Sequence, residues 1–284
     1  MIMRNKSLLL PIIALFSICA VGASAGGQKL TAEEIIAKHQ DSIAPLEKRQ
    51  ALKSLIAVGD VRVDYITQKN LPAAGRIVIA SDLNKMFLGM SLNATDYPQE
   101  KLVFDGSKAS VAMVRSGTRS VLGNFIQSNS LVLSQGLFSG ALSSSWALLN
   151  PGESKAKIST AGTKDIGGRK TYALSFAPKG GSDIEITMYF DQETFRHVRT
   201  EYKRTSSASI GKTIDESARQ SETRIVVTED FSDFKVTDGV TLPSKYKISY
   251  SVLGANTTQI TWTSDISEFA VNPKLDPGSF RTGN

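Results

Sequence analysis

The two histidines of this sequence, His39 and His197, are the side chains best suited to act as a catalytic base near neutral pH. A hydrolase also needs a nucleophile that such a base activates. Ser139-Gly140 resembles part of a nucleophile turn, but no G-x-S-x-G motif occurs after residue 26. His39 lies on an apolar helical stripe, where we expect it to be buried or partly exposed rather than to take part in catalysis.

Three aspartates, Asp230, Asp233 and Asp238, lie close together in the sequence near a turn. We expect them to be solvated turn residues, because aspartate side chains commonly bond the local backbone in turns. The sequence contains no H-E-x-x-H motif, no EF-hand loop and no glycine-rich phosphate loop. It therefore predicts no catalytic residue, no metal site and no cofactor, and we expect that the protein is not an enzyme.

The first 25 residues have the features of an export signal. Arg4 and Lys6 precede an apolar segment, residues 8–21, and residues 23–25 match the small-residue pattern at which such signals are cleaved. The apolar segment is shorter than the roughly 20 residues that cross a bilayer. We therefore predict a signal peptide over 1–25, cleaved after Ala25, and a single exported domain over 26–284.

The only cysteine, Cys19, lies inside this leader. A lipidated cysteine normally follows a small residue, whereas Ile18 precedes this one, so we do not expect lipoprotein processing. The mature chain then has no cysteine, which excludes disulfides and thiolate metal sites. Loss of Arg4 and Lys6 lowers the formal charge from +6 to +4. An excess this small, spread along the chain, does not predict nucleic-acid binding.

Two helical segments precede the part of the chain in which apolar and polar residues alternate. Thr31 and Glu34 form a capping box, and the apolar stripe that follows ends at Ile43. Pro45 suits the first turn of a second short helix, which we expect to extend through Leu55.

Alternation of apolar and polar residues with a period of two runs through most of the mature chain and is typical of β-strands. In one such segment, Ile184, Ile186, Met188 and Phe190 share a face. About ten or eleven strands are expected, mostly without helices between them, which favours antiparallel pairing with one buried face. Because a large sheet twists, we expect it to curl into a half-open antiparallel β-barrel, a mainly β (α+β) fold.

A long uncharged segment, residues 120–152, interrupts the strands in the middle of the chain. Apolar residues from Phe138 to Leu149 fall at helical spacing, and Pro151 would end the helix. Eleven of the 29 residues from 121 to 149 are Asn, Gln or Ser, which argues against a membrane-spanning helix. We expect a helical plug or lid on the concave face of the barrel. A second polar stretch, 204–222, is expected to form a solvated loop.

Several segments together resemble periplasmic outer-membrane lipoprotein-sorting proteins of the LolA/LolB type. They are the leader, the helix "TAEEIIAKHQ", the insert "GLFSGALSSSWALL" and the late segment "FSDFKVTDGVTLPSKYKISY". The resemblance covers most of the mature chain as a layout, with "DGVTLP" as its most recognisable local piece. It implies a periplasmic location and a half-open barrel, closed by helices, whose apolar cavity takes up the acyl chains of a lipoprotein in transit. The central insert of this chain is longer and richer in serine than in that family.

A dry apolar cleft suits such cargo, because each buried methylene contributes about 0.8 kcal/mol. We therefore expect a carrier or chaperone that binds lipid or lipoprotein acyl chains for transfer toward the outer membrane. The same apolar side chains could instead simply fill the barrel. The candidate cargo-binding residues are Phe87, Phe104, Leu133, Leu137, Phe138, Leu142, Trp146, Leu149, Met188 and Trp262.

The alternative is a non-enzymatic envelope sensor or scaffold that uses the same barrel to bind a protein partner. Edge strands and the apolar insert could serve for strand addition in such a protein. A carrier needs empty volume inside the barrel, whereas a scaffold would fill it with side chains. We expect a monomer without nucleic-acid partners, and the apolar insert is compatible with peripheral membrane contact and with an envelope transfer partner.

Overall fold

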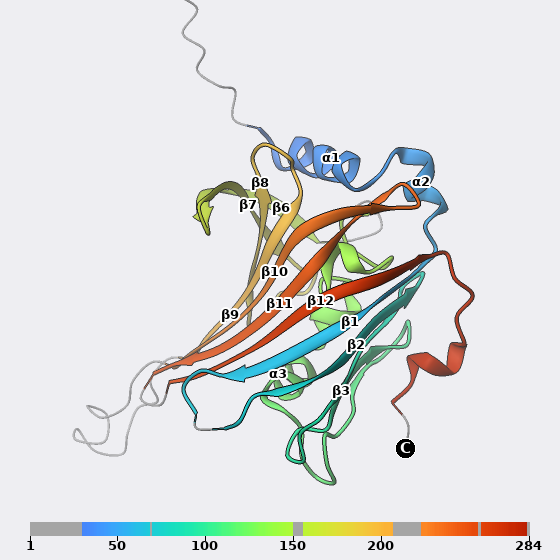
Figure 1. Cartoon of the computed structure of the whole chain (residues 1–284). Helices are drawn as coiled ribbons and strands as arrows, with labels where there is room; N and C mark the ends of the chain where they lie inside the picture. Colours follow the sequence, from blue (N-terminus) through green and yellow to red (C-terminus); the bar gives the residue numbers. More distant parts are fainter. Residues whose placement is uncertain (1–29, 69, 150–155, 207–222, 255–256, 283–284) are drawn as a thin grey trace, which may run out of the picture. The chain divides into compact units, whose positions relative to one another are not determined.

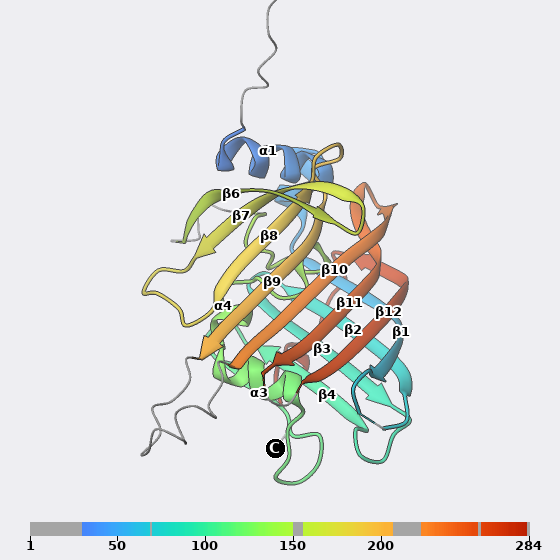
Figure 2. The same cartoon turned by 90° about the vertical axis from the view of Figure 1, so that its left-hand side faces the viewer.

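Twelve antiparallel strands form one continuous sheet in the computed structural model, which describes residues 30–68, 70–149, 156–206, 223–254 and 257–282 (Figure 1). The strands are β1 (Ser54–Tyr65), β2 (Ala73–Asp82), β3 (Lys85–Leu92), β4 (Gln99–Phe104), β5 (Ala109–Val111), β6 (Lys157–Ile166), β7 (Arg169–Ala177), β8 (Glu185–Asp191), β9 (His197–Ser206), β10 (Thr223–Thr237), β11 (Val240–Leu253) and β12 (Thr258–Val271). Figures 1 and 2 show this sheet curving around the central part of the chain. The predicted half-open antiparallel barrel is confirmed, with twelve strands in the described residues rather than ten or eleven.

The predicted signal peptide and Cys19 lie outside the described residues, as does most of the polar stretch 204–222. Residues Thr31–Asn284 form one compact unit. None of the helices in the described residues has the length and apolar character that a membrane crossing needs.

The order of the strands explains why a central insert exists. Neighbours in the sheet are neighbours in the sequence throughout, except that β1 lies beside β12 in the middle. The first five strands therefore run from the middle to one edge, at β5, and the last seven run from the opposite edge, at β6, back to the middle. The chain between β5 and β6 has to pass from one edge of the curved sheet to the other.

One face of the sheet is apolar because the residues that point inward on one strand pair with inward-pointing apolar residues on the next. Val63 pairs with Trp262, which pairs with Ile248, and all three are at most 1% exposed. On the opposite face Asp60 pairs with Arg76, and their side chains form an ion pair of 2.9 Å. The sheet thus has one apolar concave face and one charged outer face, as alternation with a period of two requires.

The N-terminal helices cover one end of the sheet. In α1 (Ala32–Ile43) the capping box is present: Glu34 N donates to Thr31 Oγ1, and Thr31 N donates to the Glu34 carboxylate. The helix lies across the strand ends and contacts β6 and β11 (Figure 2). The second helix, α2 (Leu46–Ala51), ends earlier than predicted, because Leu55 already belongs to β1 and pairs with both β2 and β12.

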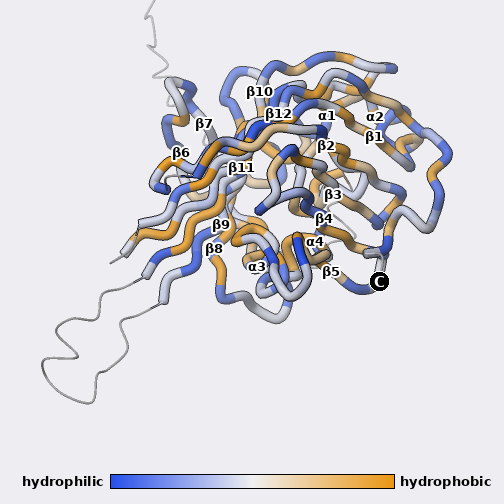
Figure 3. The backbone as a smooth tube through the Cα atoms, turned by 60° about the horizontal axis from the view of Figure 1, so that its bottom comes forward, coloured by the Kyte–Doolittle hydropathy of each residue, from blue (hydrophilic) through white to orange (hydrophobic). Residues whose placement is uncertain are grey.

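The insert lies on the concave face, but it is not the continuous helix that we predicted over Phe138–Leu149. Its regular elements are α3 (Val121–Ser128), α4 (Leu131–Ser134) and the single 3-10 turn η1 (Gly140–Leu142). Gly136, Ser139 and Gly140 all have positive φ, which a right-handed helix does not allow. With the bottom of Figure 1 turned forward, α3 and α4 lie between β8–β9 on one side and β4–β5 on the other (Figure 3).

The last described residues cover part of the outer face. The 3-10 helix η2 (Pro277–Phe280) contacts β3, and Phe280 is 1% exposed. Its ring lies 5.8 Å from the ring of Phe87, measured between centroids, and Lys101 Nζ donates to the carbonyl oxygen of Arg281. The C-terminal segment is therefore a strap over β3 and β4.

Two strand glycines provide a matched test of how tightly the curved sheet is packed. A Cβ at Gly75 in β2 would lie 1.9 Å from the Ser91 carbonyl oxygen, whereas one at Gly89 in β3 would meet only the Phe87 ring, at 3.6 Å. We expect G75A to lower the free energy of unfolding by about 1–3 kcal/mol, as overpacking does. G89A should stay within about 1 kcal/mol of the wild type. Equal losses in denaturant unfolding would contradict the close approach at Gly75.

Candidate functional site

Nine of the ten candidate cargo-binding residues lie on the concave face or in the insert that covers it. Leu133, Leu137, Phe138, Leu142 and Trp146 of the insert are each at most 2% exposed, and Leu149 is 8% exposed. The sheet contributes Phe104, Met188 and Trp262, at 6%, 0% and 1% exposure. In the described residues, therefore, the side chains of the insert occupy the concave face.

Phe87, also named as a candidate cargo-binding residue, is the exception, because it does not lie on the concave face. Its neighbours Met86 and Leu88 point inward and are fully buried, so Phe87 points to the outer face. There it packs beneath Phe280 of the C-terminal strap. The dense apolar run Met86–Leu88 hid the alternation, because both faces of β3 are covered at this point.

A buried carboxylate of the sheet holds the middle of the insert. Glu229 of β10 is fully buried, and its Oε1 accepts a hydrogen bond of 2.7 Å from the backbone N–H of Ser139. Tyr202 Oη donates to Glu229 Oε2 at 2.7 Å, and Tyr246 Oη donates to Oε1. Three donors from β9, β11 and the insert thus converge on one carboxylate, which satisfies a group that is costly to bury alone.

Burial raises the pKa of Glu229 from 4.5 to about 7, although the hydrogen bonds from Tyr246, Tyr202 and Ser139 favour its charged form. The contact with Ser139 depends on an unusual backbone conformation, since Ser139 has a φ of 68°. Glu229 is therefore a titratable group at the point where the insert meets the sheet.

A second buried carboxylate holds the start of the insert. Glu100 of β4 is 1% exposed, and its Oε2 accepts hydrogen bonds from Tyr97 Oη, at 2.7 Å, and from the Ser120 hydroxyl. Ser120 is also the N-cap of α3, because its Oγ accepts from Gly123 N at 2.8 Å. A Cβ at Gly123 would lie 3.1 Å from Glu100 Oε1, so glycine lets α3 approach the carboxylate closely. Burial raises the pKa of Glu100 as well.

The two histidines meet the end of the insert at Trp146. Trp146 Nε1 donates to His39 Nε2 at 3.0 Å, and the other ring nitrogen of His39 lies 3.0 Å from the Phe195 carbonyl oxygen. A neutral imidazole protonated at Nδ1 makes both bonds. Burial lowers the pKa of His39 to about 4, which agrees with the neutral form. His39 therefore links α1 to the insert, as a buried residue.

His197 packs on a face of the same indole, whereas His39 lies at its edge. Its ring is stacked on Trp146 at 4.8 Å between centroids and lies 4.7 Å from Phe231. Its Nε2 lies 2.8 Å from Thr200 Oγ1, and burial holds its pKa well below the ordinary value. No hydrogen bond joins His197 to the Ser139 hydroxyl, and both residues are at most 1% exposed. The pair therefore lacks the geometry of an activated nucleophile.

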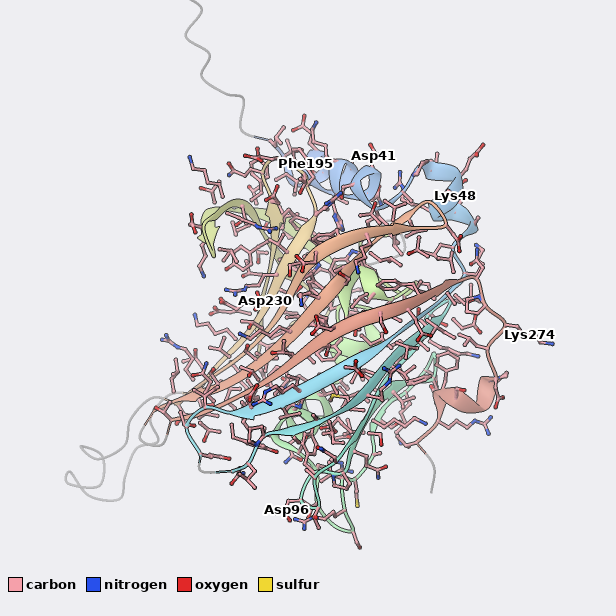
Figure 4. All side chains as sticks on the ribbon, viewed as in Figure 1. Asp41, Lys48, Asp96, Phe195, Asp230 and Lys274 are labelled. Carbon is pink, nitrogen blue, oxygen red and sulfur yellow. The ribbon has the colours of Figure 1, made fainter. Side chains whose placement is uncertain are left out.

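The three aspartates considered in the sequence do not form a cluster at a turn. Asp230 and Asp233 both lie within β10, and only Asp238 is in the turn before β11. Asp230 is on the outer face, where it pairs with Arg199 of the neighbouring strand. Figure 4 shows Asp230 in the middle of the sheet, far from the turn beside Lys48.

Two further groups of hydrogen bonds hold the late part of the insert. We call the hydrogen bonds between the insert and the rest of the protein its tethers. Ser144 donates from both its backbone N and its hydroxyl to Ser81 Oγ of β2, at 2.7 and 2.9 Å. Gln40 Nε2 of α1 donates to the carbonyl oxygens of Leu148 and Leu149, at 2.9 and 3.2 Å. Polar contacts thus position the insert at five places along its length, while apolar side chains fill the space between them.

A hollow of about 210 Å³, which we call the α3 hollow, opens at the end of the concave face opposite α1. Figure 4 places Asp96 at this end of the unit and Phe195 beside α1 at the other. The hollow is lined by Tyr65, Gln68, Asp96, Tyr97, Val114, Thr118, Arg119, Ser120, Val121, Ile260 and Trp262. Two larger hollows, of about 490 and 620 Å³, lie elsewhere and include several exposed charged residues in their walls.

Sequence reasoning missed both buried glutamates, although a signal for each was present. Glu229 lies between Val227 and Phe231 at the inward positions of β10, and Glu100 lies two residues before Leu102 on the inward face of β4. A charged residue in the inward register of a strand marks a buried carboxylate that needs donors. Those donors come from other strands, from Tyr97 and from the insert, whose path the sequence did not reveal.

No protein-family model and no curated protein matches this sequence. Among solved structures, a LolA superfamily protein from Nitrosomonas europaea is 11% identical with a TM-score of 0.49, over 89% of this chain and 99% of that one. A domain assigned to outer-membrane lipoprotein sorting from Vibrio parahaemolyticus is 11% identical with a TM-score of 0.42, over 87% and 94%. A DUF1329 family protein from Desulfovibrio piger is 11% identical with a TM-score of 0.42, over 88% and 97%. The similarity agrees with the resemblance predicted from the sequence, and at these values it supports no conclusion about function.

The raised pKa of Glu229 predicts a stability that falls as the pH rises. The folded state holds the carboxyl proton up to about pH 7 and the unfolded state only up to about pH 4.5, so the folded state binds more protons between these values. Over this window we expect the free energy of unfolding of the wild type to fall, relative to that of E229Q, by on the order of 3 kcal/mol.

Denaturant unfolding of both proteins across the window checks this difference. The comparison cancels the opposite effect of His39, which loses stability as the pH falls from 6.5 to about 4. E193Q, at an exposed position in the β8–β9 turn, controls for the loss of one carboxylate. A difference between wild type and E229Q that does not change with pH would contradict the burial of an ionisable Glu229.

Proposed function

We propose that this protein is a carrier or chaperone that binds lipid, or the acyl chains of lipoproteins, on the concave face of its sheet. In this proposal the insert covers the concave face while no cargo is bound, and cargo displaces it. The observation that carries the proposal is the kind of segment that covers the concave face. The apolar face is covered by one uncharged segment with only short helical turns, rather than by a second sheet or a long helix.

Exchange of the insert for an acyl chain is energetically reasonable. Cargo would bury methylenes against the same face at about 0.8 kcal/mol each, which offsets the loss of contacts made by Phe138, Leu142 and Trp146. The tethers that would break are neutral or buried hydrogen bonds, and each contributes only about 0.5–3 kcal/mol net. Return of the insert would cover the apolar face again after release, so that it is never left exposed to water.

The proposal includes a periplasmic location, cleavage after Ala25 and transfer of cargo toward the outer membrane. These parts are supported by the predicted export signal and by the resemblance of the sequence to lipoprotein-sorting proteins. It also includes a role in binding rather than catalysis. Ser139 of the insert and His197 of β9, the nearest approach to a nucleophile and base, are both buried.

A second candidate function is favoured by one observation. The side chains of the insert fill the concave face in the described residues, as they would in an envelope sensor or scaffold that binds a protein partner. In that case the insert is a permanent part of the core and never leaves the sheet. The two functions therefore differ in whether the insert moves.

A reversible disulfide that locks the insert onto β2 distinguishes the two candidate functions. The hydroxyls of Ser81 and Ser144 are 2.9 Å apart, a separation that suits replacement of both residues by cysteines joined in a disulfide. In a chain with Cys19→Ser, we expect oxidised S81C/S144C to bind a fluorescent triacylated lipopeptide at least about tenfold more weakly than the wild type. Reduction should restore binding, because it frees the insert from β2.

The single variants S81C and S144C, treated with the same oxidant, control for loss of the serine hydrogen bonds. Binding by the oxidised double variant that equals binding by the reduced form would show that cargo does not need the insert to move. Absence of binding by every form, the wild type included, would favour the scaffold.

A further inference from the structure

A single arginine lies on the wall of the α3 hollow without an acidic partner. Arg119 is half-buried, and its Nε makes one long hydrogen bond, of 3.4 Å, to the carbonyl oxygen of Val111. Within the described residues no carboxylate lies within ion-pair distance of its guanidinium, whereas nearby Arg115 pairs with Asp96 at 2.8 Å. A guanidinium presents five donors, so most of those on Arg119 remain available to a ligand.

On the floor of the hollow, in contrast, the polar groups of Trp262, Tyr97 and Ser120 are hydrogen-bonded, although Oε1 of the buried Glu100 has no partner. Trp262 Nε1 donates to Tyr97 Oη at 3.1 Å, and Tyr97 Oη in turn donates to Glu100. The Ser120 hydroxyl also donates to Glu100. These bonds leave the rings and aliphatic groups of the floor to face the hollow. The wall therefore combines an apolar surface with one available cation.

Asp96 is the acidic residue of this wall, and its carboxylate already accepts a hydrogen bond from Arg115. The volume of about 210 Å³ is below the roughly 300–1,000 Å³ of pockets for compact drug-sized ligands, so it suits the end of one extended chain. A ligand with an apolar chain and an anionic group at one end would match both the apolar surface of the wall and its available arginine.

We propose that the α3 hollow is a binding site for a single-chain amphiphile with an anionic head group, a carboxylate or a phosphate. The hydrocarbon lies against Trp262, Ile260 and Val121, and the head group accepts hydrogen bonds from the guanidinium of Arg119. This inference goes beyond the proposed function, because the hollow is open while the insert occupies the concave face. It assigns the protein a site that needs no movement of the insert.

Binding at the hollow can be followed at Trp262. The chain has two tryptophans, so an NMR spectrum shows two indole N–H signals, and W262F identifies the one from the hollow. In oxidised S81C/S144C with Cys19→Ser, we expect oleate, below its micelle concentration, to shift the Trp262 signal saturably. Oleyl alcohol, with the same chain and no charge, should bind more weakly, by about tenfold, as expected for loss of a charge-assisted hydrogen bond. Lysophosphatidic acid, tested beside oleate, shows whether phosphate or carboxylate is preferred.

Substitution of Arg119 tests the head-group contact. R119Q should weaken oleate binding by about tenfold and leave oleyl alcohol binding unchanged. R119K keeps the charge and should retain most of the preference for oleate. R76Q removes the same charge from the outer face and should behave as the unsubstituted protein.

Two outcomes would overturn the inference. One is an unshifted Trp262 signal in the locked protein, even if the unlocked protein binds oleate, since binding would then occur beneath the insert. The other is an R119Q protein that still prefers oleate to oleyl alcohol. Because the insert is locked in this experiment, its result is independent of whether cargo displaces the insert.

Discussion

The connection between the two edges of the sheet is the constraint on which the rest of the structure depends. Because β1 and β12 lie side by side in the middle, the chain leaves the sheet at β5 and re-enters it at the opposite edge, at β6. The curved sheet offers an apolar concave face along this path, and a segment that crosses it is driven to bury apolar side chains there. The composition of the insert, which is uncharged and contains seven leucines, two phenylalanines and one tryptophan, follows from that path.

Apolar contact alone does not specify where along the face such a segment rests, since the hydrophobic effect has no direction. Directional contacts supply the register. Glu100 binds the start of the insert, Glu229 its middle, and Ser81 and His39 its later part. Buried carboxylates are weak contributors to stability, because desolvation offsets much of their attraction for donors. We attribute to these groups a positioning role: they specify where along the concave face the insert lies.

Much of the fold was predictable because it depends on local rules. Alternation placed Ile184 and Phe190 inward, and the capping box placed the start of α1 at Ala32. Failures occurred where long-range contacts override local pattern. The helical spacing of Phe138 to Leu149 is real, but Ser139 and Gly140 within this segment have positive φ, which breaks the helix. Ser139 bonds to Glu229 of β10, and Gly140 lies against side chains of β9 and β10. The outward position of Phe87 was not predicted, because the strap that covers it comes from the other end of the sequence. The donors of Glu229 come from three segments far apart in sequence, so no local pattern identifies them.

The central claim is that the concave face exchanges its own insert for lipophilic cargo. The most direct measurement is native mass spectrometry of the protein purified from its own envelope, followed by extraction and identification of any lipid. The account predicts a near-stoichiometric adduct whose mass matches a lipid or an acylated peptide and which is lost on extraction. A mass equal to that of the bare chain, unchanged after incubation with acylated peptides, would contradict it and leave the insert as a permanent part of the core.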